Sequence, residues 1–195
     1  MTFINLKYKY IFISNLEEIS NIIYEYFLSI SEDNIYLNLK TFKEINLLLN
    51  YNKLDINNFY VFTFIKNPIQ IIYNNFLNDI KNNYHLKKNG IIYGNNIQSL
   101  YSYINYDHCR NIFNIKDYYY NNDSLPNNMN IFKIENIKET LTKLTNKFNI
   151  NSNSINNKLD TNIIKLSKIN FEINSNLENL IKSKYPIFWS YYNNN

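Results

Sequence analysis

Hydrophobic residues occur along the chain in two patterns: short continuous runs, and runs in which they recur every three or four residues. A continuous run of β-formers is typical of a strand buried on both faces, whereas the spaced runs are typical of amphipathic helices. Strands are predicted at residues 9–14, 35–39, 59–65 and 130–134. Helices are predicted at residues 16–30, 41–49, 68–80, 97–104, 136–148 and 176–184. Because strands and helices alternate, the pattern predicts an α/β fold, a three-layer sandwich with a central, mainly parallel sheet.

The clearest change of pattern lies within residues 59–80. The first part of this stretch has the character of a buried strand, and the second part has helical spacing. Asn67 suits the N-cap of the helix and Pro68 suits its first position. Lys66 is therefore expected at the carboxyl end of a buried strand, beside the unbonded amides of a helix start. A cation and backbone amides in that arrangement suit an anion such as a phosphate.

Composition and charge narrow the class of protein. The length of 195 residues suits a single domain over residues 1–195, with a less regular segment at 106–128 and a polar loop at 149–162. The chain has no alanine, one valine and one arginine, and we interpret its richness in Asn, Ile, Lys, Tyr and Phe as the mark of an AT-rich genome. A net charge of +4 allows an anionic ligand but does not favour nucleic acid as a partner.

Cysteine usage and hydropathy bear on location. The single cysteine, Cys109, excludes an internal disulfide framework and favours a reducing compartment. No apolar run is long enough for a membrane span, and the N-terminal residues lack the pattern of a signal peptide. We therefore expect a cytoplasmic or otherwise intracellular protein without a membrane anchor. His108 precedes Cys109, but no second cysteine completes a zinc pattern, so no metal is expected.

One pair of motifs gives the chain a family resemblance. Residues 62–68 read Phe-Thr-Phe-Ile-Lys-Asn-Pro, and residues 74–76 read Asn-Asn-Phe. They resemble the Phe-x-Phe-Val-Arg-Asn/Asp-Pro and Ser-x-Tyr motifs of the membrane-type (carbohydrate) sulfotransferases. In that family the Arg and the Ser hold the 3′-phosphate of the sulfuryl donor, 3′-phosphoadenylyl sulfate (PAPS). The resemblance implies these two roles for Lys66 and Asn74, while Ile71 stands where the family has a second Arg.

Further matches follow in the same order along the chain. Residues 131–137, Ile-Phe-Lys-Ile-Glu-Asn-Ile, resemble the family's Arg-Phe-Glu-Asn-Leu junction between a strand and a helix. Residues 156–161 are similar to its His-x-Asn-Lys-Ser/Thr segment, and residues 185–192 are similar to its aromatic C-terminal end. Since order and spacing hold over most of the chain, the resemblance implies a P-loop-like sulfotransferase architecture.

The opening loop is where the chain departs most from the family. The family's loop, Phe-Ile-His-Ile-Pro-Lys-Thr-Ala-Gly-Thr-Ser, cradles the 5′-phosphosulfate and aligns with residues 12–22, where Glu17 replaces the lysine and Ser20 the glycine. A carboxylate beside a phosphosulfate repels it by about 1–4 kcal/mol, depending on the local dielectric. Loss of the glycine removes an easy positive φ. The resemblance leaves Ser14, Ser20 and Asn21 as the polar side chains that would meet this end of the donor.

Two carboxylates of the same loop are the candidates for catalysis. Glu17 and Glu18 could act as a general base, because sulfuryl transfer requires the acceptor hydroxyl to lose its proton. The alternative for Glu17 is structural, since Ser14 and Glu17 have the spacing of a capping box that starts a helix. The catalytic residue is therefore unassigned.

Three functions remain open from the sequence. The first is a sulfotransferase that transfers a sulfuryl group from PAPS to a hydroxyl of a carbohydrate or a similar acceptor. The second is a catalytically inactive relative with the same fold that serves as a binding or interaction module. The third is an unrelated α/β nucleotide-binding protein. The first of these has a small-molecule nucleotide as donor and a carbohydrate as acceptor.

Overall fold

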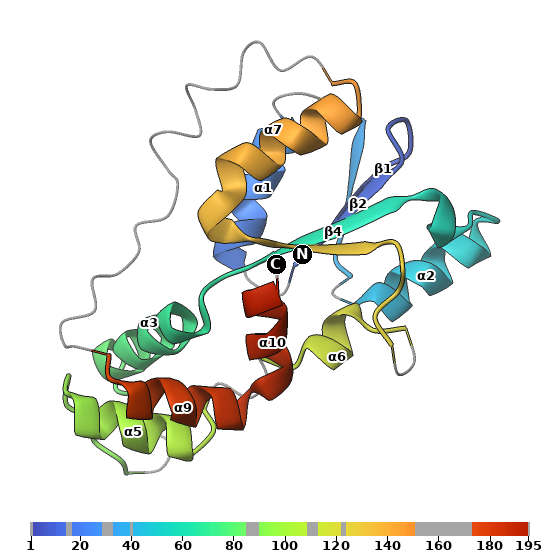
Figure 1. Ribbon diagram of the computed structural model, residues 1–195. Helices are drawn as coiled ribbons and strands as arrows, with labels where there is room; N and C mark the ends of the chain where they lie inside the picture. The colour runs from blue at the N-terminus through green and yellow to red at the C-terminus, as the bar shows by residue number, and fades with distance from the viewer. Residues whose placement is uncertain are drawn as a thin grey trace. The chain divides into compact units, whose positions relative to one another are not determined.

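The computed structural model describes most of the chain (Figure 1). The described residues are 2–14, 17–28, 33–39, 41–84, 90–108, 113–121, 124–150 and 173–194. The chain divides into two compact units. The sheet unit comprises residues 1–65, 115–165 and 195, and the helical unit comprises residues 66–114 and 166–194. The single-domain organisation expected from the length stays a prediction.

The sheet unit is built on a five-stranded mixed sheet with strand order β3-β1-β2-β4-β5. The strands are β1 (Thr2–Asn5), β2 (Tyr10–Ile13), β3 (Asn34–Leu37), β4 (Tyr60–Ile65) and β5 (Met129–Lys133). Parallel pairing joins β2 to β4 and β4 to β5, whereas β1 pairs antiparallel with both β2 and β3. The α/β class and the parallel centre of the sheet are therefore confirmed, and the N-terminal hairpin makes the whole sheet mixed.

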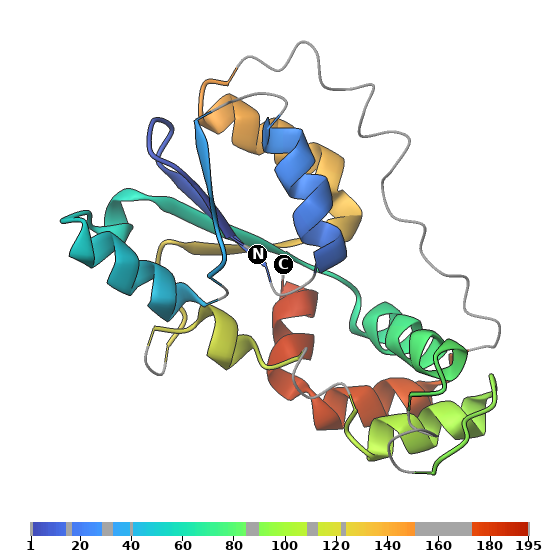
Figure 2. The same ribbon diagram turned by 180° about the vertical axis from the view of Figure 1, so that it is seen from behind.

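Helices lie on both faces of this sheet (Figures 1 and 2). On one face are α1 (Glu17–Leu28) and α7 (Ile137–Lys147), and on the other are α2 (Phe42–Tyr51) and α6 (Ile115–Tyr119). Short 3-10 helices, η1 (Ile56–Asn58) and η2 (Ile134–Asn136), precede β4 and α7. On the α6 side the hydroxyl of Thr63 donates to the hydroxyl of Tyr119 at 3.2 Å. This bond joins α6 to the centre of the sheet.

Aromatic rings fill the core between the sheet and the pair α1 and α7. Phe62 and Phe64 of β4 and Phe12 of β2 point to this side, because alternate residues of a strand face the same way. Phe27 of α1 and Leu141 of α7 pack against them and are fully buried. Large rings supply the volume that smaller residues fill in other proteins, as expected for a chain without alanine.

In the described part of the helical unit, four helices pack on one another. They are α3 (Pro68–Lys81), α5 (Ile97–Asn105), α9 (Ser175–Lys184) and α10 (Pro186–Asn194). Two buried tyrosines tie the unit together: the hydroxyl of Tyr103 donates to Asp79 at 2.7 Å, and that of Tyr185 donates to Asp107 at 2.9 Å. On α10, the ring of Trp189 lies 5.0 Å from the ammonium of Lys182.

Besides the short 3-10 helices, three of the described elements were absent from the sequence prediction. β1 has four residues and α6 five, which is too short for a periodic pattern, and α6 falls in the segment expected to be irregular. α10 covers the aromatic tail, in which hydrophobic residues are continuous rather than spaced, so no helical period is visible. Its Pro186 stands at the first position of the helix, the place that proline favours. The polar loop at 149–162 lies mostly outside the described residues.

Candidate functional site

The junction between β4 and α3 has the local structure that the sequence predicts. β4 ends at Ile65 and α3 begins at Pro68. Asn67 is the N-cap, and its side-chain oxygen accepts the N–H of Ile69 at 2.9 Å. Since proline and asparagine occupy their preferred positions, the chain turns from strand to helix within two residues. Lys66 occupies that turn.

The cap leaves fewer amides for an anion than the sequence suggests. Pro68 has no N–H, and the N–H of Ile69 is already bonded to Asn67. The N–H of Ile71 donates to the backbone oxygen of Asn67 at 3.0 Å. Of the first helical amides, only that of Gln70 is left for a ligand. Charge from a side chain, rather than the helix start, must therefore carry any binding of a phosphate here.

Asn67 is expected to contribute measurable stability through this cap. Replacing it with alanine removes the acceptor for the Ile69 N–H and should lower the free energy of unfolding by about 1 kcal/mol. Asn78, exposed in the same helix, is the matched control, since alanine there improves helix propensity and should be neutral or slightly stabilising. Urea titrations of both variants, followed by circular dichroism, compare the two. Equal stabilities for the two variants would show that the cap contributes nothing.

Lys66 is a buried cation. Its exposed fraction is only 3%, which is rare for lysine. A phosphate that reached this ammonium would be withdrawn from bulk water together with it. Desolvation strengthens the attraction between the two charges, but it also requires further hydrogen bonds to the phosphate oxygens. Neighbouring polar side chains therefore decide whether the position suits an anion.

α3, which begins two residues after Lys66, carries two polar side chains whose oxygens lack hydrogen-bond partners. Asn74 and Gln70 are four residues apart and so share one face of the helix. Each has a buried side-chain oxygen, Oδ1 and Oε1, with no hydrogen-bond partner. A buried amide that lacks a partner is costly, and it is usually satisfied by water or by a ligand. Since the oxygen and nitrogen of an amide can exchange places by a flip, Asn74 can present its NH2 group at this point.

The predicted residues of the opening loop belong to the sheet unit, whereas Lys66 and Asn74 belong to the helical unit. Ser14 directly follows β2 and is fully buried, and Ser20 is fully buried within α1. Asn21 is exposed on the same helix. The remaining candidates, Glu17 and Glu18, occupy the first turn of α1, but their side chains lie outside the described residues. The capping box that Ser14 and Glu17 could form stays a prediction.

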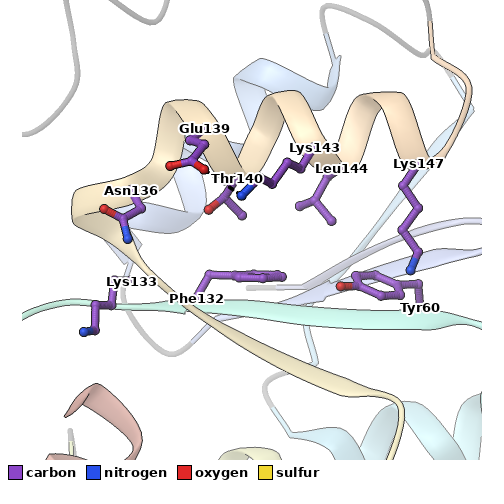
Figure 3. A pocket seen from close by; sticks show the side chains of 9 residues that line it. All are labelled: Tyr60, Phe132, Lys133, Asn136, Glu139, Thr140, Lys143, Leu144 and Lys147. Atoms are coloured by element: carbon purple, nitrogen blue, oxygen red, sulfur yellow. Dashed lines mark hydrogen bonds and ion pairs between the residues drawn. The ribbon is translucent and has the colours of Figure 1, made fainter. Parts of the chain in front are cut away.

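A groove that the sequence did not indicate lies between α7 and the strands β4 and β5 (Figure 3). Its volume is about 310 Å³. The rings of Phe132 and Tyr60 form its floor, and Glu139, Lys143 and Lys147 of α7 stand above it. The helix itself was predicted from its apolar residues, but these three charged residues were not singled out. The aromatic floor was not predictable, because it depends on the pairing of β5 with β4.

Comparisons with known proteins add no family to this description. Neither the protein-family models, nor the curated proteins, nor the solved structures contain a match to the chain. Within the described ranges, no group of three or more His, Cys, Asp or Glu residues is arranged to hold a metal ion. None of the helices described combines the length and the apolar character that crossing a membrane requires.

Proposed function

We propose that the protein is a sulfotransferase-like nucleotide-binding protein that holds the 3′-phosphate of PAPS, or of its desulfated product PAP, with Lys66 and Asn74. The observation that carries the proposal is the junction after β4. The buried lysine there supplies a cation. Two turns further along α3, the side-chain oxygen of Asn74 is buried without a hydrogen-bond partner, and a flip of the amide puts an NH2 donor in its place. A phosphate needs both kinds of group when it is withdrawn from water.

The strand arrangement supports the same proposal. β2 and β4 are parallel neighbours, with Phe12 opposite Phe62, so their carboxyl ends lie at the same edge of the sheet. Ligands of α/β proteins with parallel strands bind at such edges. Each of the two strands is followed by a helix, as the P-loop-like architecture requires. Because of these two strand–helix connections, we include the sulfotransferase architecture in the proposal.

The residues fit the phosphosulfate end of PAPS less well. In the family a lysine and a glycine hold this group, and the corresponding residues here are Glu17 and Ser20. Ser20 is fully buried within α1, and Glu17 brings a negative charge to the first turn of that helix. We therefore propose nucleotide binding as the retained function. Transfer of the sulfuryl group to a carbohydrate hydroxyl would require cations that the opening loop does not supply.

Lys66 should determine the preference for a 3′-phosphate. In calorimetric titrations we expect PAP to bind more tightly than 5′-AMP, which lacks that phosphate. Replacement of Lys66 with methionine keeps the buried aliphatic chain and removes the charge, so the preference should fall by about 1.5–3 kcal/mol, roughly 10- to 150-fold in affinity. Lys43→Met, at an exposed position of α2, is the control and should leave the preference unchanged.

The ratio of the two affinities makes this test specific. A variant that merely loosens the fold would weaken both nucleotides and leave their ratio as it was. The proposal is wrong if PAP fails to bind at millimolar concentration, or if Lys66→Met keeps the wild-type ratio. Thermal melts of each variant confirm that the compared proteins are folded.

A further inference from the structure

The groove beside α7 has a preorganised aromatic floor. The ring of Phe132 packs on that of Phe64 with 5.8 Å between centroids, and the ring of Tyr60 meets that of Phe148 edge-on at 5.7 Å. Both rings are therefore held in place by neighbouring rings of the core. Figure 3 shows their faces turned toward α7 across the groove. A flat ligand can stack on such a surface without first ordering it.

Two ammonium groups stand above this floor. Lys147 lies with its nitrogen 4.0 Å from the centroid of the Tyr60 ring. Lys143, one helical turn earlier, is 2.6 Å from a carboxylate oxygen of Glu139, which holds its side chain along the groove. The three side chains together carry one net positive charge. Lys133 also borders the groove, but Figure 3 shows its side chain directed away from the helix.

We propose that this groove binds a nucleoside monophosphate, with the base stacked on Phe132 and the phosphate between Lys143 and Lys147. The aromatic floor indicates a ligand with a flat ring, since a bare phosphate would not stack on it. The two ammonium groups indicate a negatively charged ligand, because a neutral aromatic compound would partly desolvate them without compensation. A volume of about 310 Å³ is at the small end of ligand sites, which favours a monophosphate over a di- or triphosphate.

This site is independent of the one proposed around Lys66. Every residue that lines the groove belongs to the sheet unit, and Lys66 does not line it. The two sites also differ in what they recognise. The groove selects for a ring attached to a phosphate, whereas Lys66 and Asn74 select for a second, 3′ phosphate. The ratio of the affinities for PAP and AMP therefore reports on the Lys66 site, and the ratio of the affinities for AMP and ribose 5-phosphate reports on the groove.

The test measures how much the base contributes to binding. Titrations of AMP, UMP and ribose 5-phosphate into the Lys66→Met protein, followed by NMR shifts of α7 amides, give affinities for the groove alone. We expect both nucleotides to bind roughly 5- to 150-fold more tightly than ribose 5-phosphate, which has no base to stack. Phe132→Leu keeps an apolar side chain but should abolish this preference.

The lysines provide a second, independent variant. The double change Lys143→Gln and Lys147→Gln alters only exposed positions and should weaken AMP at least about tenfold. Lys138→Gln, at an exposed position of the same helix outside the groove, should leave binding as in the parent protein.

A short uridine oligonucleotide identifies the source of the ligand. Free nucleotide is the ligand if the oligonucleotide binds like UMP, and a nucleic-acid strand is the ligand if it binds at least about tenfold more tightly.

The proposal is overturned if ribose 5-phosphate binds as tightly as AMP. It is also overturned if the double lysine variant binds AMP no more weakly than Lys138→Gln does. Both results can be read even if Phe132→Leu fails to fold, because neither depends on that variant. Loss of the preference for PAP in Lys66→Met, with the base preference retained, would show that the two sites act separately.

Discussion

Replacement of Phe62 with alanine is expected to lower the free energy of unfolding by about 3–5 kcal/mol, a large part of the total stability of an ordinary domain. Phe62 is fully buried at the centre of β4, with strands on both sides. Its ring has five aromatic neighbours at centroid distances from 5.4 to 6.3 Å, contributed by Phe12, Phe27, Tyr10, Tyr60 and Phe64. Rings of this size cannot collapse into the space that alanine leaves.

Two further variants identify the cause of the loss. Phe62→Leu fills part of the space and should cost clearly less than Phe62→Ala. Tyr51→Ala changes an aromatic residue that is 87% exposed, and it should shift stability by no more than about 0.5 kcal/mol. Urea titrations followed by circular dichroism give the three values. A loss below about 1 kcal/mol for Phe62→Ala would mean that the aromatic cluster does not hold the sheet unit together.

Alkaline pH is the second condition with a large expected effect. Burial raises the pKa of the tyrosines Tyr10, Tyr26, Tyr60 and Tyr93 above the ordinary value of 10.0. Once the chain unfolds, these phenols regain their ordinary pKa. The folded protein therefore keeps protons that the unfolded chain loses above about pH 10. Stability from this source is fully present below pH 10 and falls as the pH rises toward the raised pKa values.

Tyr10 should account for the steepest single part of that loss. It is fully buried, so above about pH 10 it should contribute a slope of about 1.4 kcal/mol per pH unit. Tyr10→Phe removes the hydrogen bond of 2.6 Å to Asn34, which should cost about 1 kcal/mol at neutral pH, and it should flatten the decline above pH 10.

Urea titrations at several pH values between neutral and strongly alkaline measure both effects of Tyr10→Phe. The exposed Tyr51→Phe serves as the control and should follow the wild-type curve. If Tyr10→Phe declined as steeply as the wild type, ionisation of the buried phenol would play no part in alkaline unfolding.

The elements that the sequence predicted are those that carry their own pattern. β4 and α3 were predicted because the period changes at Asn67 and Pro68, and α7 because its apolar residues recur every three or four positions throughout. β1 is a strand because it pairs with a neighbour on each side, and a run of four residues is too short to predict such pairing. Its antiparallel direction also explains why the sheet is mixed although alternation of strands and helices suggested a parallel one.

The two candidate sites also differ in how far the sequence could predict them. The junction at Lys66 is local, so neighbouring residues were sufficient to predict its shape, although not the burial of the lysine. The groove is not local. Its floor exists because parallel pairing places Phe132 of the end strand β5 opposite Phe64, on the same face of the sheet as Tyr60 of β4. Residues so distant in the chain meet on one surface only through the fold, so the sequence pattern could not predict the groove.

The position of Trp189 gives the chain a built-in optical reporter. It is the only tryptophan, and it lies in α10 of the helical unit. Selectively excited indole fluorescence therefore follows that unit alone, whereas far-ultraviolet dichroism follows the whole backbone. Phe62→Ala changes only the sheet unit. Comparing its unfolding curves from fluorescence and from dichroism therefore shows whether the sheet unit and the helical unit unfold together. Coincident curves would identify one cooperative body, and a fluorescence change that lags behind would identify two.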